Sequence, residues 1–274
     1  MPELPEVQTI VSDLAPLLTG ARIIRVQVWD PLLVRFPGAE DLNRRLSGGI
    51  IRTMTRRGKY IVVGLDQGLT WLVHLRMTGR LLTKLEEDER HLRAQFTLDN
   101  GICLSYCDLR RFGDMWAFFP GEEEHLGGFR TLGPEPLSEG FSQDWLLQAF
   151  ARRKAPVKAL LLNQSIVAGL GNIYVDEALF VAGIHPGRQG YSLTEEECGK
   201  LAAAVKEVIQ KAISSRGTTF RDYRSGLGTV GEYQQLLQVY GRKGEECTHC
   251  GTLLDCMRIG GRTSVYCPRC QKQK

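Results

Sequence analysis

Four cysteines near the end of the chain constrain the fold more than any other feature of this sequence. Two residues separate Cys247 from Cys250, two separate Cys267 from Cys270, and sixteen lie between the pairs. The spacing C-x2-C…C-x2-C is typical of zinc ribbons, in which two knuckles close one tetrahedral site of four thiolates. The sequence therefore predicts one structural Zn²⁺ held by these four cysteines.

Disulfides and a histidine ligand are the alternatives at this site. His249 lies within the first knuckle and could compete as a ligand, although four cysteines satisfy zinc without it. The other cysteines have no framework spacing; they are Cys103, Cys107, Cys198 and Cys256. The chain begins with charged and proline residues rather than an apolar leader. We therefore expect a reducing, cytoplasmic compartment, and zinc rather than disulfides.

Length and charge narrow the class of protein. The 274 residues suggest about two domains in addition to the metal module, and no run of about 18 apolar residues could span a membrane. Residues 1–150 carry 17 Lys and Arg against 20 Asp and Glu, whereas residues 151–274 carry 18 against 11. This asymmetry favours a nucleic-acid partner, although basic surfaces without such partners are common.

Hydrophobic spacing predicts one helix followed by a β-rich region. Apolar residues recur at helical spacing from about Glu6 until Gly20. Short β-rich runs separated by turns follow at 23–29, 49–55, 60–65, 70–75, 93–98, 102–107 and 115–119. Many short strands at this spacing predict a β-sandwich or barrel.

Helical periodicity takes over after about residue 134. Helices are expected at about 142–151, 156–163, from Asn172 onward, and at 193–214. The glycine-containing loop before Asn172 predicts either an anion site at a helix start or an ordinary helix-turn-helix packing element. The glycine-rich segment 224–231 is expected to be mobile.

The first residues, Met1-Pro2-Glu3-Leu4-Pro5-Glu6, suggest a nucleophile. Removal of Met1 makes Pro2 a secondary amine, and because terminal amines have pKa values of about 7.7 to 8.0, part of it is unprotonated near neutral pH. Such an amine can attack a sugar C1′ or an aldehyde and form an iminium ion. The alternative, favoured by this motif alone, is an exposed leader entering a helix, with Pro5 and Glu6 in its first turn.

Six motifs in order along the chain resemble the formamidopyrimidine-DNA glycosylases, the bacterial 8-oxoguanine repair enzymes. They are Pro2-Glu3-Leu4-Pro5-Glu6-Val7, Arg57-Gly58-Lys59-Tyr60, His74-Leu75-Arg76-Met77-Thr78-Gly79, Asp108-Leu109-Arg110-Arg111-Phe112-Gly113, Ala168-Gly169-Leu170-Gly171-Asn172-Ile173-Tyr174 and the cysteine array. The resemblance implies an α+β multi-domain fold with an N-terminal helix and β-sandwich (1–134), a helix-two-turn-helix domain (135–238) and a zinc ribbon (239–274).

The resemblance also implies a reaction. Pro2 would attack C1′ of an oxidised purine nucleotide while the base leaves, and Glu3 would handle protons as the sugar ring opens. The iminium would then permit β- and δ-elimination, which cuts the strand on both sides. Because this chemistry requires an everted nucleotide, the partner would be double-stranded DNA containing an oxidised base. The protein would be a monomer at the bacterial nucleoid.

Further roles are implied by the same resemblance. Lys59 and Arg262 would join the catalytic residues, and Glu6 and Glu177 would support the site. DNA contacts would come from His74, Met77, Arg110, Arg111, Phe112, Lys158, Asn172 and Arg262. Met77, Arg110 and Phe112 would form a wedge that fills the gap left by the extruded base.

Ordinary structural roles remain open for several of these residues. Lys59 could be a solvated strand-end lysine, and Lys158 an exposed helix residue. Glu6 and Glu177 could cap or decorate helices. Met77 and Phe112 could pack in a core, but a glycine follows each within two residues, so we expect loop tips.

Three positions depart from the family pattern, and two other functions compete. Gln8 stands where the family commonly has glutamate, Thr263 replaces a small residue, and Arg93 lies where a histidine is often found. An endonuclease VIII-like activity on oxidised pyrimidines is disfavoured by Leu4, since that group usually opens Pro-Glu-Gly-Pro-Glu. A non-catalytic damaged-DNA-binding zinc protein is disfavoured by the intact Pro2 and Glu3.

Overall fold

The chain forms two compact units in a computed structural model that describes residues 1–85, 89–219, 227 and 231–273. The first unit comprises Met1–Arg130 and Ser215–Glu232, and the second comprises Thr131–Ser214 and Tyr233–Lys274. Of the segment predicted to be mobile, 224–231, all but Leu227 and Gly231 lies outside the described residues. Among the helices described, none is long and apolar enough to cross a membrane.

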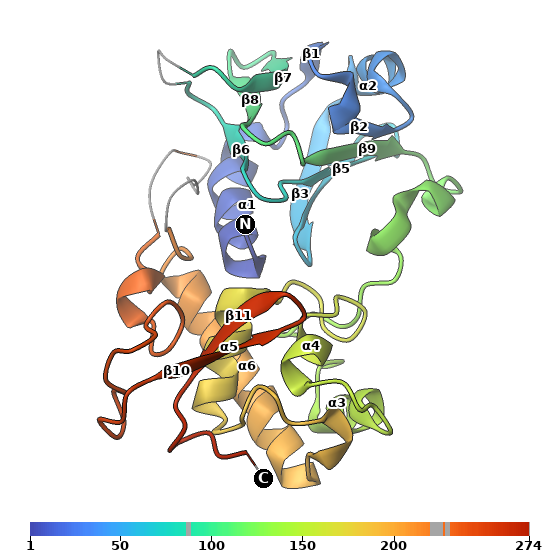
Figure 1. Cartoon of the computed structure of the whole chain (residues 1–274). Helices are drawn as coiled ribbons and strands as arrows, with labels where there is room; N and C mark the ends of the chain where they lie inside the picture. Colours follow the sequence, from blue (N-terminus) through green and yellow to red (C-terminus); the bar gives the residue numbers. More distant parts are fainter. Residues whose placement is uncertain (86–88, 220–226, 228–230, 274) are drawn as a thin grey trace. The chain divides into compact units, whose positions relative to one another are not determined.

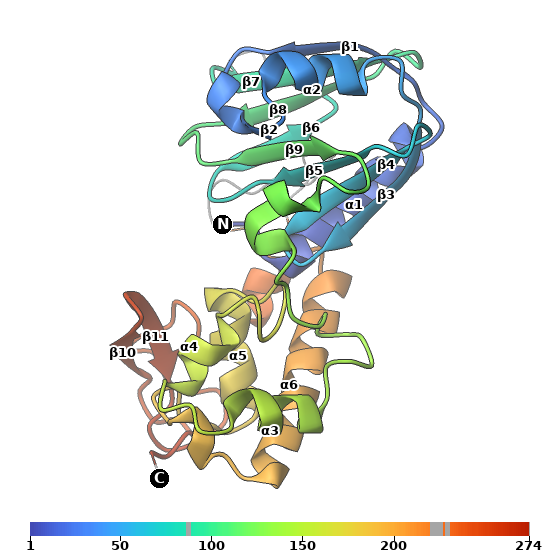
Figure 2. The ribbon, with the colours of Figure 1, turned by 90° about the vertical axis from the view of Figure 1, so that its right-hand side faces the viewer.

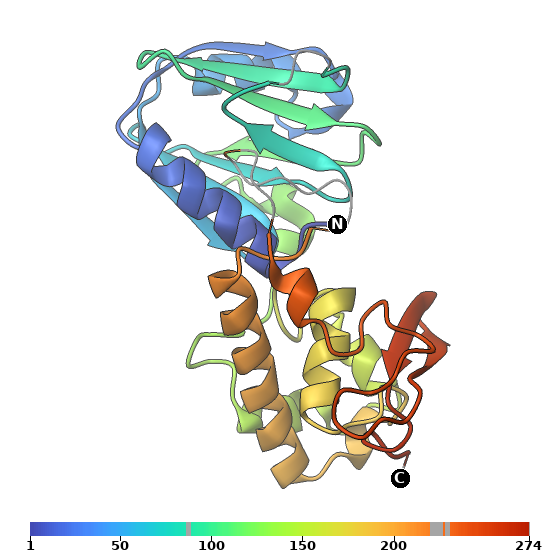
Figure 3. The ribbon, with the colours of Figure 1, turned by 90° about the vertical axis from the view of Figure 1, so that its left-hand side faces the viewer.

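The first unit begins with helix α1 (Leu4–Leu18), which confirms the predicted N-terminal helix. Pro5 occupies the first turn, where its missing N–H costs no hydrogen bond. Val7, Ile10 and Leu14 recur at helical spacing and are buried, because α1 packs against strand β3 (Ile51–Arg57; Figure 3). Helix α1 is thereby held against the edge strand of a sheet.

Two β-sheets stacked face to face form the rest of the first unit (Figure 2). The strands are β1 (Ile23–Val28), β2 (Val34–Phe36), β3 (Ile51–Arg57), β4 (Tyr60–Leu65), β5 (Thr70–His74), β6 (Gly79–Leu82), β7 (Leu92–Leu98), β8 (Cys103–Asp108) and β9 (Asp114–Phe118). Their orders are β1-β7-β8-β6 and β2-β9-β5-β4-β3. Trp71 of β5 meets Phe96 of β7 between the sheets, with ring centroids 4.4 Å apart. The predicted sandwich is confirmed.

Sequence spacing missed three short elements of this unit. Strands β2 and β6 have 3 and 4 residues, too few to show an alternating pattern. Helix α2 (Ala39–Leu46) buries only Leu42 and Leu46, and its remaining residues are largely charged. Two 3₁₀ helices, η1 (Pro31–Leu33) and η2 (Glu123–Phe129), complete the unit. Elements this short are stabilised by the sandwich rather than by their own periodicity.

The second unit contains the predicted helices and a small β-hairpin (Figure 1). Its elements are α3 (Gln143–Phe150), α4 (Val157–Leu161), α5 (Asn172–Val181), η3 (Gly190–Ser192), α6 (Glu195–Ser214), η4 (Tyr233–Leu236), β10 (Asp255–Ile259) and β11 (Arg262–Tyr266). Helix α5 packs against both α6 and β11. Because residues 173–180 of α5 are all buried, its two carboxylates, Asp176 and Glu177, need partners inside the protein.

Candidate functional site

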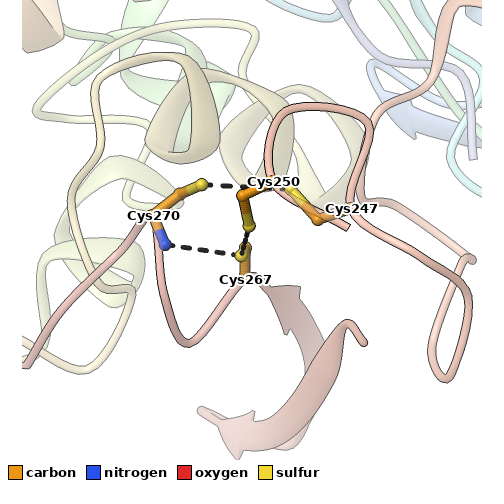
Figure 4. Close-up of side chains that lie close together, drawn as sticks. All are labelled: Cys247, Cys250, Cys267 and Cys270. Carbon is orange, nitrogen blue, oxygen red and sulfur yellow. Dashed lines mark hydrogen bonds between the residues drawn. The ribbon is translucent and has the colours of Figure 1, made fainter. Parts of the chain in front are cut away.

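The four cysteines predicted to bind zinc lie together at the ends of the β10–β11 hairpin (Figure 4). The Sγ atoms of Cys247 and Cys270 are 3.9 Å apart, and those of Cys250 and Cys267 are 3.5 Å apart. A tetrahedral site with Zn–S bonds of about 2.3 Å has S–S edges of about 3.8 Å. All four Sγ atoms lie within 4.8 Å of one another, so the thiols can surround one zinc ion, whereas a disulfide needs an S–S distance of about 2.05 Å.

The two alternatives considered for this cluster are thereby resolved. His249 is not among its members; its ring lies against Phe180 instead, with centroids 4.8 Å apart. Every cysteine of the chain is free of disulfides, including Cys256 in the same module. The cluster is therefore a four-cysteine site.

The hairpin that joins the knuckles presents Arg262 at its tip. Gly260 and Gly261 form the turn, both with positive φ (57° and 76°), a conformation that glycine adopts without strain. Arg262 opens β11 and is exposed. Its guanidinium makes no ion pair with any described residue, so it is available to an anion.

Two donors from the helices hold the backbone next to Arg262. The carbonyl oxygen of Thr263 accepts hydrogen bonds from Lys158 Nζ (2.9 Å) and from Asn172 Nδ2 (3.1 Å). Lys158 also lies 2.7 Å from Asp176 Oδ1, and both side chains are fully buried. The open alternative of an exposed helix residue is therefore excluded for Lys158. Because its side chain has no exposed surface, a direct phosphate contact would require the residues that cover its ammonium to move.

Asp176 is the residue of this anchor that sequence reasoning missed. Its Oδ1 accepts a hydrogen bond from Ser264 Oγ (2.9 Å) and its Oδ2 accepts one from Val265 N–H (3.3 Å). Burial raises the pKa of Asp176 to about 6, and the ammonium of Lys158 opposes that rise. The available signal was spacing: Asp176 follows Asn172 by one helical turn and so shares its face of α5.

Glu177 holds the chain where it enters the zinc module. Its carboxylate accepts hydrogen bonds from the backbone N–H groups of Gln238 (2.9 Å), Val239 (2.9 Å) and Tyr240 (2.8 Å). Burial raises the pKa of Glu177, and these three donors oppose the rise. A merely decorative position on the helix is therefore excluded.

The N-terminal carboxylates form a second group, in the first unit. Pro2, Glu3 and Glu6 are all buried. The N–H of Glu3, the N-cap of α1, donates to Glu6 Oε2 (2.8 Å), and the N–H of Thr218 donates to Glu6 Oε1 (2.7 Å). A Cβ at Gly217 would lie 2.7 Å from Glu6 Oε1, so glycine is required there. Glu6 thus ties the start of α1 to residues 217–218.

Lys59 and His74 lie at the ends of neighbouring strands. Tyr60 and His74 are paired across β4 and β5, with their rings edge to face at 4.6 Å. His74 Nδ1 accepts a hydrogen bond from Arg76 N–H (3.1 Å), so in the neutral ring Nε2 carries the hydrogen. Burial, with the charges of Arg76 and Lys59, lowers the pKa of His74 to about 3. His74 is therefore a neutral donor, and Lys59 is buried rather than solvated.

The residues predicted to form a wedge lie on exposed loops, as expected from their glycines. Met77 and Phe112 are 38% and 48% exposed, which excludes core packing. The guanidinium of Arg110 lies over the Phe112 ring, 4.7 Å from its centroid. Arg111 is held instead by two hydrogen bonds to Asp30 (2.6 and 2.8 Å).

The three departures from the family pattern each have a partner. Gln8 Oε1 accepts a hydrogen bond from Arg56 Nε (3.1 Å), and Arg93 Nε donates to the carbonyl of Asp108 (3.0 Å). Thr263 acts through its carbonyl, which any residue would supply. The amide at position 8 therefore still serves as an acceptor.

The candidate residues thus form two groups, one in each unit. The first unit holds Pro2, Glu3, Glu6, Lys59, His74, Met77, Arg110, Arg111 and Phe112. The second holds Lys158, Asn172, Glu177, Arg262 and the zinc ligands. The first includes a buried proline next to two buried carboxylates, together with exposed aromatic and sulfur side chains. The second offers a guanidinium on a metal-stiffened hairpin.

Comparison with known families accounts for nearly the whole chain. Residues 1–115 match the formamidopyrimidine-DNA glycosylase N-terminal domain, and residues 132–224 match the H2TH domain of the same family. Residues 244–273 match the zinc finger found in FPG and IleRS. The predicted fold class is confirmed, and the four cysteines hold one structural zinc ion.

Individual relatives match over their full length. Formamidopyrimidine-DNA glycosylases of Desulforamulus reducens and Pelotomaculum thermopropionicum are 45% and 43% identical, covering 100% of both chains in each case. The MutM (Fpg) structure from Thermus thermophilus superposes with a TM-score of 0.91 at 37% identity, covering 100% of both chains. A Lactococcus lactis FPG variant bound to DNA containing Fapy-dG has a TM-score of 0.91 at 35% identity, covering 99% of this chain and 100% of that one.

Breaking the Lys158–Asp176 pair should cost more than removing it. Asp176→Ala leaves a buried ammonium without its carboxylate, so we expect the free energy of unfolding to fall by about 3–5 kcal/mol. Lys158→Met with Asp176→Leu removes both charges and should recover most of that loss. Urea unfolding measures both. Lys200→Met, which breaks an exposed pair with Glu196, is the control and should change stability by less than about 1 kcal/mol. A double variant at least as unstable as Asp176→Ala would contradict this account.

The low pKa of His74 should appear in the pH dependence of stability. Unfolded histidine takes up a proton near pH 6.5, whereas folded His74 does so only near 3. Stability from this residue is therefore complete above about pH 6.5 and lost as the pH falls toward 3, at about 1.4 kcal/mol per pH unit. His74→Gln lacks this term, so the difference between the wild-type and variant unfolding free energies should change with pH at that slope. Parallel curves would contradict the assignment.

Proposed function

Because the chain belongs to the formamidopyrimidine-DNA glycosylase family, we propose that Pro2 is the nucleophile of a bifunctional glycosylase and AP lyase that removes oxidised purines. The chain is a DNA glycosylase of base excision repair, and lyase activity is typical of the family. The observation that carries the assignment of Pro2 is its place at the start of α1, directly before Glu3, whose backbone is fixed by Glu6.

The proposed reaction begins at the amine that removal of Met1 exposes. The Pro2 nitrogen bonds to C1′ of the everted nucleotide and loses its proton, and the glycosidic bond breaks with its electron pair leaving on the base, which takes up a proton as it departs. Glu3 then gives a proton to the ring oxygen O4′ as the C1′–O4′ bond opens, which leaves an iminium between C1′ and the proline nitrogen. A secondary amine yields a permanently charged iminium, which is a strong electron sink. The buried carboxylates of Glu3 and Glu6 stabilise that cation.

Strand scission follows from the same intermediate. Loss of a C2′ proton expels the 3′ phosphate, and a second elimination expels the 5′ phosphate. Water then hydrolyses the iminium and returns the free amine. Both cuts therefore depend on one covalent bond, between Pro2 and the sugar.

We assign the phosphate contacts on the grounds of charge and exposure. Arg262 is exposed and suited to two parallel hydrogen bonds with a phosphate. Asn172 keeps one amide hydrogen beyond its bond to Thr263, and His74 is a neutral donor. Lys59 supplies a positive charge close to His74 that would attract a phosphate. Lys158 acts behind Arg262 as its anchor, because its ammonium is already bound by Asp176 and Thr263.

The proposed substrate is duplex DNA with 8-oxoguanine or a formamidopyrimidine, which would place the enzyme at the bacterial nucleoid. Support comes from the Lactococcus lactis relatives, whose structures hold DNA containing Fapy-dG or an abasic site. Met77, Arg110 and Phe112 would fill the space that the everted nucleotide leaves. Arg111, bound to Asp30, would support the loop.

Borohydride trapping tests the nucleophile and the substrate class together. Duplexes with 8-oxoguanine opposite cytosine, with an oxidised pyrimidine and with no lesion are incubated with the protein, and intact-mass analysis locates the adduct. We expect an adduct at Pro2 with the oxidised purine only. An adduct favouring the pyrimidine would indicate an endonuclease VIII-like enzyme. No adduct on any duplex, with Met1 shown to be absent, would indicate a DNA-binding protein without catalysis.

Pro2→Gly should separate binding from chemistry. Glycine leaves a primary amine, whose imine can lose its charge, so we expect cleavage to fall by about 100-fold or more, with DNA affinity retained. Gel-shift and single-turnover assays give the two quantities. Wild-type turnover in this variant would contradict the terminal-amine mechanism.

Loss of zinc should affect DNA binding more than the N-terminal fold. We expect Cys250→Ser to lose the metal and most DNA affinity, because the Arg262 hairpin then lacks its metal-closed base. Cys256→Ser is the matched control, since Cys256 is in the module but outside the cluster. Metal analysis and DNA titration are the measurements. Unchanged affinity after confirmed metal loss would contradict the proposed role of the ribbon.

A further inference from the structure

The two loops that carry the wedge side chains are bonded to each other. One loop connects β5 to β6 and holds Met77; the other connects β8 to β9 and holds Arg110 and Phe112. Thr78 Oγ1, next to Met77, donates a hydrogen bond to Asp108 Oδ1 (2.5 Å) across 30 residues of sequence. The N–H of Arg110 in turn donates to Thr78 Oγ1 (3.0 Å) and to Asp108 Oδ1 (3.2 Å).

Asp108 also closes its own loop. Its second oxygen, Oδ2, accepts a hydrogen bond from the N–H of Gly113 (2.8 Å), the last residue of the loop. Asp108 itself is the last residue of β8, so its carboxylate connects the two ends of the loop. Asp108 is 1% exposed, and a buried carboxylate that loses a donor is costly. The position of Met77 and that of Phe112 therefore depend on the same carboxylate.

The hydroxyl of Tyr106 packs against the backbone of both loops. A Cβ added at Gly79 would lie 2.4 Å from Tyr106 Oη, and one added at Gly113 would lie 1.6 Å from it. Both distances are far below van der Waals contact, and Tyr106 is itself fully buried. The backbones that follow Met77 and Phe112 are thus pressed against one rigid side chain. Independent movement of either loop would break hydrogen bonds or open a cavity.

We propose that Thr78 and Asp108 are positioning residues that join the two loops into one unit, so that Met77, Arg110 and Phe112 enter the DNA together. The inference rests on the proposed function, because it assigns a task within base eversion. Both residues act through the loops that they hold together, and neither has a role in the chemistry at C1′ proposed above. Substitutions of Thr78 or Asp108 should therefore slow the reaction on duplex DNA, where the wedge fills a gap. They should leave the reaction on single-stranded DNA unchanged, because no partner strand exists there.

Thr78→Val tests the proposal by removing the hydroxyl while keeping the side chain's shape. Thr78→Ser restores the hydroxyl, and Thr55→Val, on the exposed face of β3, is the matched control. The first readout needs no catalysis: 2-aminopurine is placed beside the orphaned base of a duplex with a tetrahydrofuran abasic analogue. We expect its fluorescence to rise when wild type, Thr78→Ser or Thr55→Val binds, and to rise clearly less with Thr78→Val at saturating protein.

The second readout compares two substrates under single turnover. We expect Thr78→Val to slow excision from the 8-oxoguanine duplex by about tenfold, the scale of one lost hydrogen bond. Cleavage of an abasic site in single-stranded DNA should stay within about twofold of wild type. Equal losses on both substrates would show a general structural defect and overturn the proposal, as would an unchanged rate on the duplex.

Borohydride trapping and the fluorescence readout together separate this inference from the proposed function. Should wild type fail to trap any lesion while the fluorescence still distinguishes Thr78→Val from Thr78→Ser, the proposed chemistry is wrong and the coupled wedge stands. Should trapping succeed while all variants give the same fluorescence, the coupled wedge is wrong and the chemistry stands. Asp108→Asn provides a second variant. An amide has one oxygen, so it cannot accept hydrogen bonds from Thr78 and from Gly113 at the two positions of the carboxylate oxygens. We therefore expect the fluorescence with Asp108→Asn to be lower than with Thr78→Val.

Discussion

Buried carboxylates that must be satisfied by donors from elsewhere in the chain are the constraint on which this structure depends. An unpaired buried carboxylate is too costly to persist, so each one draws separate segments together. Glu6 joins the start of α1 to Thr218, and Asp108 joins two loops of the sandwich. Asp176 and Glu177 join α5 to the zinc hairpin and to the segment that precedes it. In every case the carboxylate lies behind a candidate functional residue rather than at the surface.

In this arrangement, buried side chains fix the positions of loops and strands, and exposed side chains next to them are available to a ligand. Met77, Phe112 and Arg262 are exposed, but the residue next to each is bound by a buried group. Thr78 Oγ1 and Gly113 N–H donate to Asp108, and the carbonyl of Thr263 accepts from Lys158. A site built this way is organised before its ligand arrives, and less conformational entropy is lost on binding. The zinc ion adds the same rigidity at the base of the Arg262 hairpin, where the surrounding apolar core is small.

Lys158 shows how tertiary context changes the meaning of a residue. The resemblance implied that this lysine contacts DNA, and an exposed position on its helix was the alternative. In the folded protein its ammonium lies between Asp176 and the carbonyl of Thr263, with no exposed surface. Its charge neutralises a buried carboxylate, and its ammonium holds the carbonyl of Thr263 next to Arg262. His74 is a similar case, because burial keeps neutral a ring that would otherwise titrate near pH 6.5.

The sequence by itself determined the features that depend on local spacing. The four-cysteine array specified its metal, helical periodicity located α1, α3, α4, α5 and α6, and six short motifs identified the family. Strands β2 and β6 were missed because they are too short to show a period, and α2 was missed because it buries only Leu42 and Leu46. Only the tertiary structure decided which donors satisfy Glu6, Asp108, Asp176 and Glu177, since Thr78 and Asp108 are 30 residues apart and Glu6 and Thr218 are 212 apart. Hydrogen bonds act over about 3 Å in space and leave no period along the chain, so the partners of a buried charge become visible only once the chain has folded.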